Sequence, residues 1–210
     1  MRGIYAWCAI GIILILATGC GPLRRLGYGG FGRDSWQQPD RVVESLALSP
    51  GAHVADLGAG GGYFTWRLAE AVGTSGKVYA VDVDPDMTSH LAGQSGEKGY
   101  PNVQPILAEF DDPLIPEAGV DLIFTCNTYH HFEAREEYFR GAARYLRPGG
   151  RLAVIEFDGR GWFQRLFPHF TAPEEIRAEM EAAGYQRVAA FDFLGRQSFQ
   201  VFERSENQPG

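Results

Sequence analysis

A cluster of glycines flanked by two acidic residues carries the clearest chemical signal in the sequence. Gly58, Gly60 and Gly62 follow a short apolar run, with Asp56 two residues before the first glycine and Asp82 24 residues after it. Glycines let the backbone turn sharply and let a ligand approach the main chain, and the start of a following helix attracts negative charge. An acid placed like Asp82 can accept hydrogen bonds from both hydroxyls of a ribose. The pattern predicts a nucleoside site at the end of a strand.

Two classes of ligand fit such a turn. A dinucleotide fingerprint needs a third glycine at the position of Tyr63, so a nucleotide-dependent dehydrogenase is disfavoured. A ligand that carries an amino group needs a carboxylate instead, and Asp56 is placed to supply one. The structural alternative is that Asp56 caps the turn between Gly60 and Tyr63.

Alternating hydrophobic periods predict the elements that must position these residues. Helices are expected from Pro39 and over 63–72, 85–97, 133–146 and 173–183, and strands over 53–57, 77–83, 103–107, 120–126, 151–157, 187–194 and 198–203. This alternation indicates an α/β, doubly wound fold with a mainly parallel sheet covered on both faces. The last two strands are joined by a tight turn, so they can only be antiparallel.

Four segments, in order, resemble the class I S-adenosylmethionine-dependent methyltransferases that act on small molecules. They are VADLGAGGGYF, VYAVDVDPDM, VDLIFTCNTYHHF and YLRPGGRLAVIEF, and the resemblance covers about residues 40–203. It implies a Rossmann-like, seven-stranded sheet of order 3-2-1-4-5-7-6 with strand 7 antiparallel. It also implies S-adenosylmethionine as cofactor and methyl transfer to a small molecule by direct in-line displacement, without a metal.

The resemblance also implies which residues bind the cofactor, all at or just after the ends of the first four strands: Asp56, Gly58, Ala59, Gly60, Gly62, Asp82, Val83, Glu109, Phe110 and Asn127. The glycines would pass under the cofactor, and Asp56 would lie near its amino-acid part. Asp82 would hold the ribose, and Val83 would pack on the adenine.

Two further positions come from the same resemblance. The pair Glu109-Phe110 would contact the adenine amine, although glutamate is longer than the aspartate usual there. Asn127 would face the methionine part. A solvated loop acid is the alternative for Glu109.

Two histidines follow the fourth predicted strand, at the end where the ligand should lie. Histidine titrates near neutrality, so His130 or His131 can act as a base or orient the substrate, and we favour His130. The alternative is that one caps the next helix and the other packs beside the pocket. Neighbouring side chains are expected to point apart and no third ligand is suitably spaced, so no metal site is predicted. Cys126 is interpreted as a buried strand residue rather than a nucleophile.

A long aromatic connection follows the fifth predicted strand. Residues 158–171 contain Trp162, Phe163, Phe167, His169 and Phe170. Long connections at this edge are often functional, so the segment is expected to cover an apolar or aromatic substrate or to face a membrane. Packing on its own domain is the alternative. The acids Glu156 and Asp158 could bind a cationic substrate group.

The first twenty residues form a separate module. The run from Ile4 to Ala17 is uncharged, and its length suits the core of a secretory signal better than a bilayer span of about 20 residues. It leads to Thr18-Gly19-Cys20, which resembles the lipobox of bacterial lipoproteins, where the cysteine is lipidated. We expect a lipoprotein of the bacterial cell envelope. The alternative is an uncleaved anchor, which would keep the domain in the cytoplasm because Arg24, Arg25 and Arg33 follow the run.

Composition bounds the remaining possibilities. The chain has 210 residues, of which 45% are hydrophobic, and a net charge of −7. This indicates a folded domain with a short appendage and disfavours nucleic acid as the main partner. The three cysteines lie far apart, without the spacing of a disulfide framework or a zinc site.

We expect four segments: a signal or anchor (1–20), a glycine-rich tether (21–38), the methyltransferase domain (39–204) and a disordered tail (205–210). The alternative for the tether is a segment that orders over the ligand through Tyr28, Phe31 and Trp36. An exported domain would lack a supply of a cofactor made in the cytosol. A non-catalytic envelope protein that keeps the fold as a binding or scaffolding module is therefore the alternative function.

Overall fold

The computed structural model describes residues 32–116, 118–160 and 170–205. The expectations for the signal segment, for Tyr28 and Phe31, for residues 161–169 and for the tail after Ser205 lie outside the described residues. Among the helices that the structure describes, none combines the length and the apolar character that a bilayer crossing requires.

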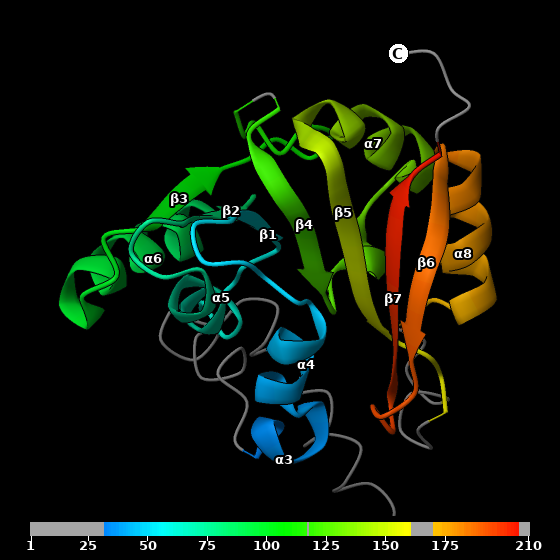
Figure 1. Cartoon of the computed structure of the whole chain (residues 1–210), viewed down its shortest axis with the longest axis horizontal. Coiled ribbons are helices and arrows are strands. Elements are labelled where there is room, and N and C mark those ends of the chain that lie inside the picture. The colour runs from blue at the N-terminus through cyan, green and yellow to red at the C-terminus, as the bar shows by residue number, and fades with distance from the viewer. Residues whose placement is uncertain (1–31, 117, 161–169, 206–210) are drawn as a thin grey trace, which may run out of the picture.

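The described residues form a seven-stranded sheet of order β3-β2-β1-β4-β5-β7-β6 (Figure 1). The strands are β1 (His53–Leu57), β2 (Lys77–Asp82), β3 (Val103–Leu107), β4 (Val120–Cys126), β5 (Leu146–Phe157), β6 (Tyr185–Phe191) and β7 (Gln197–Arg204). Strand β7 is antiparallel to both of its neighbours, β5 and β6, and the other neighbouring pairs are parallel. The predicted fold class and strand order are confirmed.

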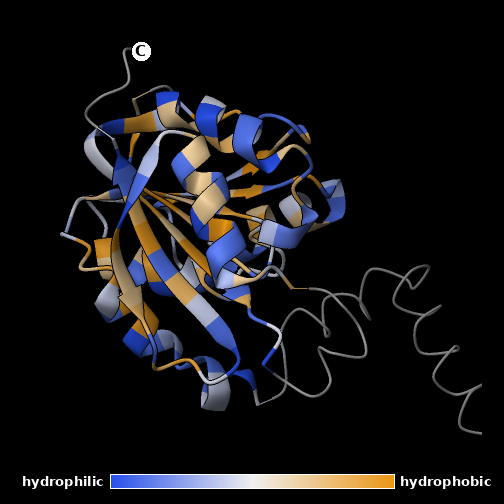
Figure 2. Ribbon diagram, turned by 90° about the vertical axis from the view of Figure 1, so that its right-hand side faces the viewer, coloured by the Kyte–Doolittle hydropathy of each residue, from blue (hydrophilic) through white to orange (hydrophobic). Residues whose placement is uncertain are grey.

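Helices cover both faces of this sheet. They are α3 (Arg33–Gln37), α4 (Pro39–Ser45), α5 (Thr65–Val72), α6 (Pro85–Lys98), α7 (Arg135–Ala142) and α8 (Pro173–Ala182), with short 3₁₀ turns at Tyr129–His131 and Ala143–Tyr145. Alternate strand residues face opposite sides, so Val54 packs with α4, α5 and α6, and Leu57 packs with α7 and α8. Figure 2 shows hydrophobic residues concentrated on the strands between the two helical layers.

Several boundaries differ from the expectation. Helix α5 begins at Thr65, two residues late, because the glycine turn occupies the chain before it. Strand β5 begins at Leu146 and includes the segment Arg147–Gly150 that was expected to be a turn, because Leu146 pairs with Val120 of β4. The register of this pairing shifts between Val120 and Leu122, which accommodates the extra residues.

Residues 33–37 also differ from the expected tether, because they form helix α3 and pack on the domain. Gln37 has no exposed surface, and its amide donates a hydrogen bond to the sulfur of Cys126 at 2.9 Å. The ring of Trp36 stacks on Phe157, with 5.9 Å between centroids. These contacts come from the ends of β4 and β5, so α3 lies beside the carboxyl ends of the central strands (Figure 1).

Candidate functional site

Two adjoining cavities lie at the carboxyl ends of β1, β2 and β4. Their volumes are about 360 and 380 Å³, within the range of small-molecule pockets. Both are lined by Gly58, Gly60, Asn127 and Thr128, so the glycine turn and the end of β4 form their common wall. We call the cavity that reaches α3 the first cavity and the one that reaches β2 and β3 the second cavity.

The glycine turn brings the backbone of β1 against the end of β4. Gly58 has a φ of +74°, and a Cβ atom there would lie 2.3 Å from the hydroxyl oxygen of Thr128. The amides of Gly58 and Ala59 both donate to the carbonyl of Val81, at 2.9 and 3.0 Å. Only glycine at position 58 allows this close approach.

Gly62 is required for the packing of the neighbouring helices. It lines neither cavity, and a Cβ atom there would lie 2.6 Å from the ring of Trp66 and 2.9 Å from Leu91. Its missing side chain lets α5 and α6 pack closely. Gly61 lines the first cavity instead.

Asp82 ends β2 and is tied to the glycine turn. Its carboxylate accepts hydrogen bonds from the amide of Gly60 at 2.8 Å and from the amide of Asp84 at 3.0 Å. Burial raises the pKa of Asp82 above its ordinary value, and the hydrogen bonds from the backbone oppose that effect. A carboxylate has about four acceptor positions, so Asp82 keeps acceptor capacity toward the second cavity, which it lines.

The second cavity also holds the other residues expected around the adenine. Val83, Glu109 and Phe110 all line it, and Phe110 is 82% exposed. The ring of Phe110 therefore lies at the mouth of the cavity without being packed into the protein core. Glu109 is exposed, which agrees with the alternative that it is a solvated loop acid, and it also borders the second cavity.

Asp56 lies in the wall of the first cavity and is 3% exposed. Among the described residues, the hydrogen bond that its carboxylate accepts comes from the hydroxyl of Thr65 at 2.6 Å, and not from the turn between Gly60 and Tyr63. Burial raises the pKa of Asp56 to about 6, although the bond from Thr65 and the charge of Arg33 act in the opposite direction. Binding of a cationic group in the first cavity would compensate this buried charge.

The end of β4 carries Cys126 and Asn127. Burial raises the pKa of the Cys126 thiol to about 12, so the sulfur stays protonated and is a poor nucleophile. Asn127 adopts a left-handed φ of 57°, and its side-chain oxygen accepts a hydrogen bond from Gln197 of β7. Asn127 is thus held at the junction of the two cavities.

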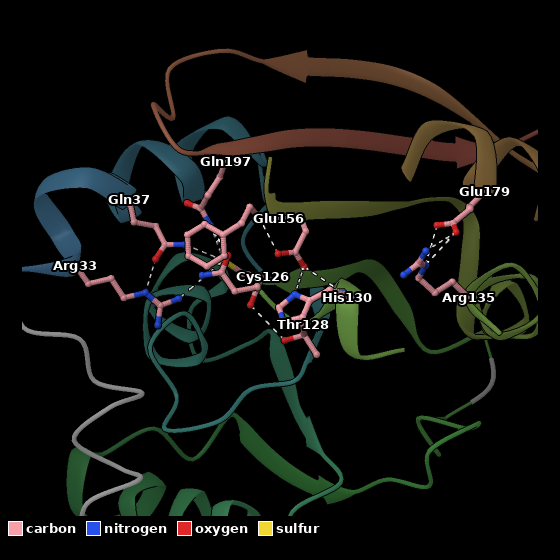
Figure 3. Close-up of polar contacts among 11 residues, drawn as sticks. Arg33, Gln37, Cys126, Thr128, His130, Arg135, Glu156, Glu179 and Gln197 are labelled. Carbon is pink, nitrogen blue, oxygen red and sulfur yellow. Dashed lines mark hydrogen bonds and ion pairs between the residues drawn. The ribbon is translucent and has the colours of Figure 1, made fainter. Parts of the chain in front are cut away.

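The two histidines have different surroundings. The Nδ1 atom of His130 lies 3.0 Å from a carboxylate oxygen of Glu156, a side chain with no exposed surface (Figure 3). His131 lines the second cavity, whereas His130 lines neither. The expectation that the side chains of His130 and His131 point apart is wrong. Residues 129–131 form a 3₁₀ turn, and the centroids of the two imidazole rings lie 4.0 Å apart. The described residues contain no group of three side chains that could hold a metal ion.

The two acids at the end of β5 and directly after it, Glu156 and Asp158, already have partners. Glu156 accepts hydrogen bonds from the amide of Phe157 at 2.8 Å and of His130 at 3.2 Å, and Asp158 forms an ion pair with Arg160. The structure therefore does not present them to a cationic substrate group. Phe170 packs against Gly159, and the other aromatic residues of the connection lie outside the described residues.

Helix α3 supplies residues that sequence reasoning gave little weight. Arg33 and Trp36 line the first cavity together with Phe157 and Tyr63. The sequence predicts a ligand contact for Trp36 only in the alternative in which the glycine-rich segment orders over the ligand. It uses Arg33 only as one of the charges that follow the apolar N-terminal run. The signal that could have indicated them is the spacing of Arg33 and Trp36, which lie three positions apart, on one face of a helix, shortly before Pro39.

Sequence comparison with known proteins identifies relatives that are methyltransferases. Residues 48–203 match the model of a family described as a methyltransferase domain. A ubiquinone/menaquinone biosynthesis C-methyltransferase of Ectopseudomonas mendocina is 30% identical over 121 residues, which are 57% of this chain and 47% of that protein. A nocamycin O-methyltransferase of Saccharothrix syringae is 28% identical over 163 residues, 76% of this chain and 58% of that protein. The chain therefore spans about half the length of the curated relatives it matches.

A solved structure shows the same architecture. The crystal structure of a SAM-dependent methyltransferase from Aquifex aeolicus superposes with a TM-score of 0.79 at 25% identity. The superposition covers 87% of this chain and 97% of that one. The likeness thus extends over nearly all of the described domain.

Proposed function

Since the chain belongs to the methyltransferase domain family, we propose that it is an enzyme that transfers a methyl group to a small organic molecule. S-adenosylmethionine is the cofactor that the family and its SAM-dependent structural neighbour imply. The observation that carries the proposal is the pair of cavities joined at Gly58 and Gly60, with Asp56 in the lining of the first and Asp82 in the lining of the second.

The residues on the two sides of the junction fit this cofactor. The second cavity combines an acid for ribose hydroxyls, Asp82, with the apolar surfaces of Val83 and Phe110 for a purine ring. The first cavity presents Asp56, whose buried carboxylate suits an ammonium group. A side chain at position 58, in the wall that the two cavities share, would clash with Thr128. Ala59, Gly60 and Asn127 would complete the binding site.

The cofactor supplies an activated methyl group when it is bound, so the protein has to position and desolvate the reactants. Holding them in line contributes several kcal/mol through proximity alone. Asn127 and Thr128 line both cavities, so they would border the reacting atoms. The aromatic faces of Trp36 and Phe157 would exclude water from the first cavity and favour an apolar or aromatic substrate.

His130 is our candidate for the base that removes a proton from the substrate. If Nδ1 donates its hydrogen to Glu156, the neutral ring presents Nε2 as the acceptor. A base of this kind contributes roughly 10²–10⁴ to the rate. His131 is the second candidate because it lines the second cavity.

Calorimetric titration of the full-length chain with S-adenosylhomocysteine, the demethylated product, tests the cofactor site. We expect binding by the parent and a loss of about 10–100-fold for Asp82→Ala, since a charge-assisted hydrogen bond contributes about 1.5–3 kcal/mol. Asp86→Ala is the matched control, because Asp86 lies four residues later on α6 and lines neither cavity. The absence of binding by the parent would remove the proposal.

A non-catalytic envelope protein is the second candidate function. It is supported by the export-like segment, because the cofactor is made in the cytosol. Incubation with methyl-labelled cofactor and a panel of phenols, quinols and lipids separates the two functions. Label transfer supports the enzyme, whereas binding without transfer to any acceptor supports the scaffold.

We also propose that the N-terminus attaches the domain to the membrane of the cell envelope, through lipid on Cys20 or through an uncleaved anchor. The apolar run from Ile4 to Ala17 supports attachment. Phosphatase and β-lactamase fusions at Gln37 report the side of the membrane. Activity of both reporters outside the cytoplasm would support the lipoprotein, and inactivity of both would support the cytoplasmic anchor.

A further inference from the structure

Helix α3 brings a positive charge into the same cavity as the buried acid of β1. Arg33 and Asp56 both line the first cavity, although they belong to elements separated by the whole of α4. The charge of Arg33 lowers the pKa of Asp56, against the larger effect of burial. One cavity of about 360 Å³ therefore presents a guanidinium and a carboxylate to whatever occupies it.

The guanidinium of Arg33 is held in place by three neighbours. Its Cζ atom lies 3.8 Å from the centroid of the Tyr63 ring, which is a close cation–π contact. Its Nε donates a hydrogen bond to Gln37, and its Nη2 lies 3.9 Å from the sulfur of Cys126 (Figure 3). Tyr63 stands where a dinucleotide fingerprint has its third glycine. The residue that breaks the fingerprint is thus the residue that supports Arg33.

A second set of contacts fixes the Tyr63 ring. The tyrosine hydroxyl donates to Asp34 of α3 at 2.5 Å, and Arg67 of α5 contacts the same carboxylate at 3.3 Å. The Cζ atom of Arg67 lies 4.6 Å from the centroid of the Tyr63 ring. Asp34 thereby ties α3 to α5 and keeps Arg33 over the cavity.

We propose that Arg33 and Asp56 together bind the zwitterionic end of an α-amino acid, with the guanidinium on its carboxylate and the aspartate on its ammonium group. This inference rests on the proposed function, because the α-amino acid would be the methionine part of the cofactor. A planar guanidinium binds a carboxylate through two parallel hydrogen bonds. Apart from Arg33, the charged residue that lines this cavity is Asp56, whose carboxylate would repel the carboxylate of a ligand.

Arg33 is therefore a specificity-determining residue that separates the intact cofactor from analogues without the α-carboxylate. The probes are S-adenosylhomocysteine and its decarboxylated analogue, 5′-deoxy-5′-(3-aminopropylthio)adenosine. These two ligands share the adenosine and the amino group and differ in one carboxylate. Calorimetry on the full-length chain should give the parent a preference of about 10–100-fold for S-adenosylhomocysteine.

The Arg33→Gln variant should lose most of this preference. We expect its affinity for S-adenosylhomocysteine to fall about 10–100-fold, while its affinity for the decarboxylated analogue changes less than about threefold. The Arg33→Lys variant keeps the charge without the planar fork and should show an intermediate preference. Arg41→Gln is the matched control, because Arg41 of the neighbouring helix α4 contacts Phe193 and Gln38 and lines neither of the two cavities. It should leave both affinities unchanged.

Two results would overturn the inference while leaving the proposed function intact. The first is that the parent binds both ligands with equal affinity. The second is that Arg33→Gln lowers the affinity for both ligands by the same factor, as a purely structural role for α3 would predict. A parent that binds neither ligand would overturn the proposed function as well.

Discussion

The imidazole of His130 contacts Glu156 through Nδ1 at 3.0 Å, across the gap between the 3₁₀ turn after β4 and the end of β5. Glu156 has no exposed surface, so the burial of its carboxylate must be compensated by partners. The amides of His130 and Phe157 supply two of these partners. The contact therefore determines both the orientation of the ring and the stability of the site.

This contact predicts a strong coupling between the two side chains. His130→Ala should lower the free energy of unfolding by about 2–4 kcal/mol, because it removes a partner from a fully buried carboxylate. The double variant His130→Ala/Glu156→Gln should lose less unfolding free energy than the two single variants lose together. The difference, which is the coupling energy, should be about 1–3 kcal/mol. Urea unfolding measures all three variants. The exposed neighbour His131, changed to alanine, should cost under about 1 kcal/mol, and additive effects would refute the coupling.

Stability should depend on pH through Asp56. Its pKa is about 6 in the folded protein against 3.8 as the ordinary value. Between these values the folded state holds a proton that the unfolded state has lost, so stability falls as the pH rises from about 4 to about 6. Asp56→Asn should therefore stabilise the ligand-free protein by roughly 3 kcal/mol at pH 8, and this gain should vanish toward pH 4. An equal gain at both pH values in urea unfolding would contradict the assignment.

The glycine turn allows a matched comparison of two substitutions. Gly58 and Gly149 have φ values of +74° and +75°, but an added Cβ meets Thr128 only at position 58 and lies in open space at position 149. Gly149→Ala should cost about 1 kcal/mol for the left-handed backbone. Gly58→Ala should cost about 1–3 kcal/mol more because of the clash. Equal losses in urea unfolding would show that Thr128 moves aside.

Phe110 should contribute to binding and not to stability. Its ring is 82% exposed at the mouth of the second cavity, so Phe110→Ala should leave the unfolding free energy within about 0.5 kcal/mol. Affinity for S-adenosylhomocysteine should fall about 3–10-fold, the value of one aromatic stacking contact. Val188→Ala, at a 45% exposed position on the edge strand β6, should leave affinity unchanged. An unaltered affinity in the Phe110 variant would place the purine elsewhere.

Much of the fold follows from local sequence. Alternating periods predicted the seven strands and the antiparallel last pair, and the family resemblance supplied the strand order. Helix α3 could not be predicted in this way, because it has five residues beside a glycine-rich stretch and its contacts come from Cys126 and Phe157, about 90 and 120 residues away. Pairing between distant strands likewise extended β5 through residues 147–150.

The sequence predicts the position of a site residue where that residue lies at the end of a strand that can itself be predicted. Asp56 lies one residue before the end of β1 and Asp82 ends the neighbouring β2, so both were expected at the crevice and both line it. The sequence did not indicate the packing of Trp66 and Leu91 against Gly62, because close helix packing and close ligand approach both require a glycine. Tyr63 was interpreted only as a missing glycine, since its contact with Arg33 depends on where a distant helix lies.

Residues near both ends of the described chain hold side chains that line the first cavity. Gln37 bonds to Cys126, and Gln197 bonds to Asn127. When β1 to β5 have emerged from the ribosome, β7, the strand whose Gln197 holds Asn127, has not yet emerged. During synthesis, the hydrogen bond that holds Asn127 can therefore form only after the final hairpin has emerged.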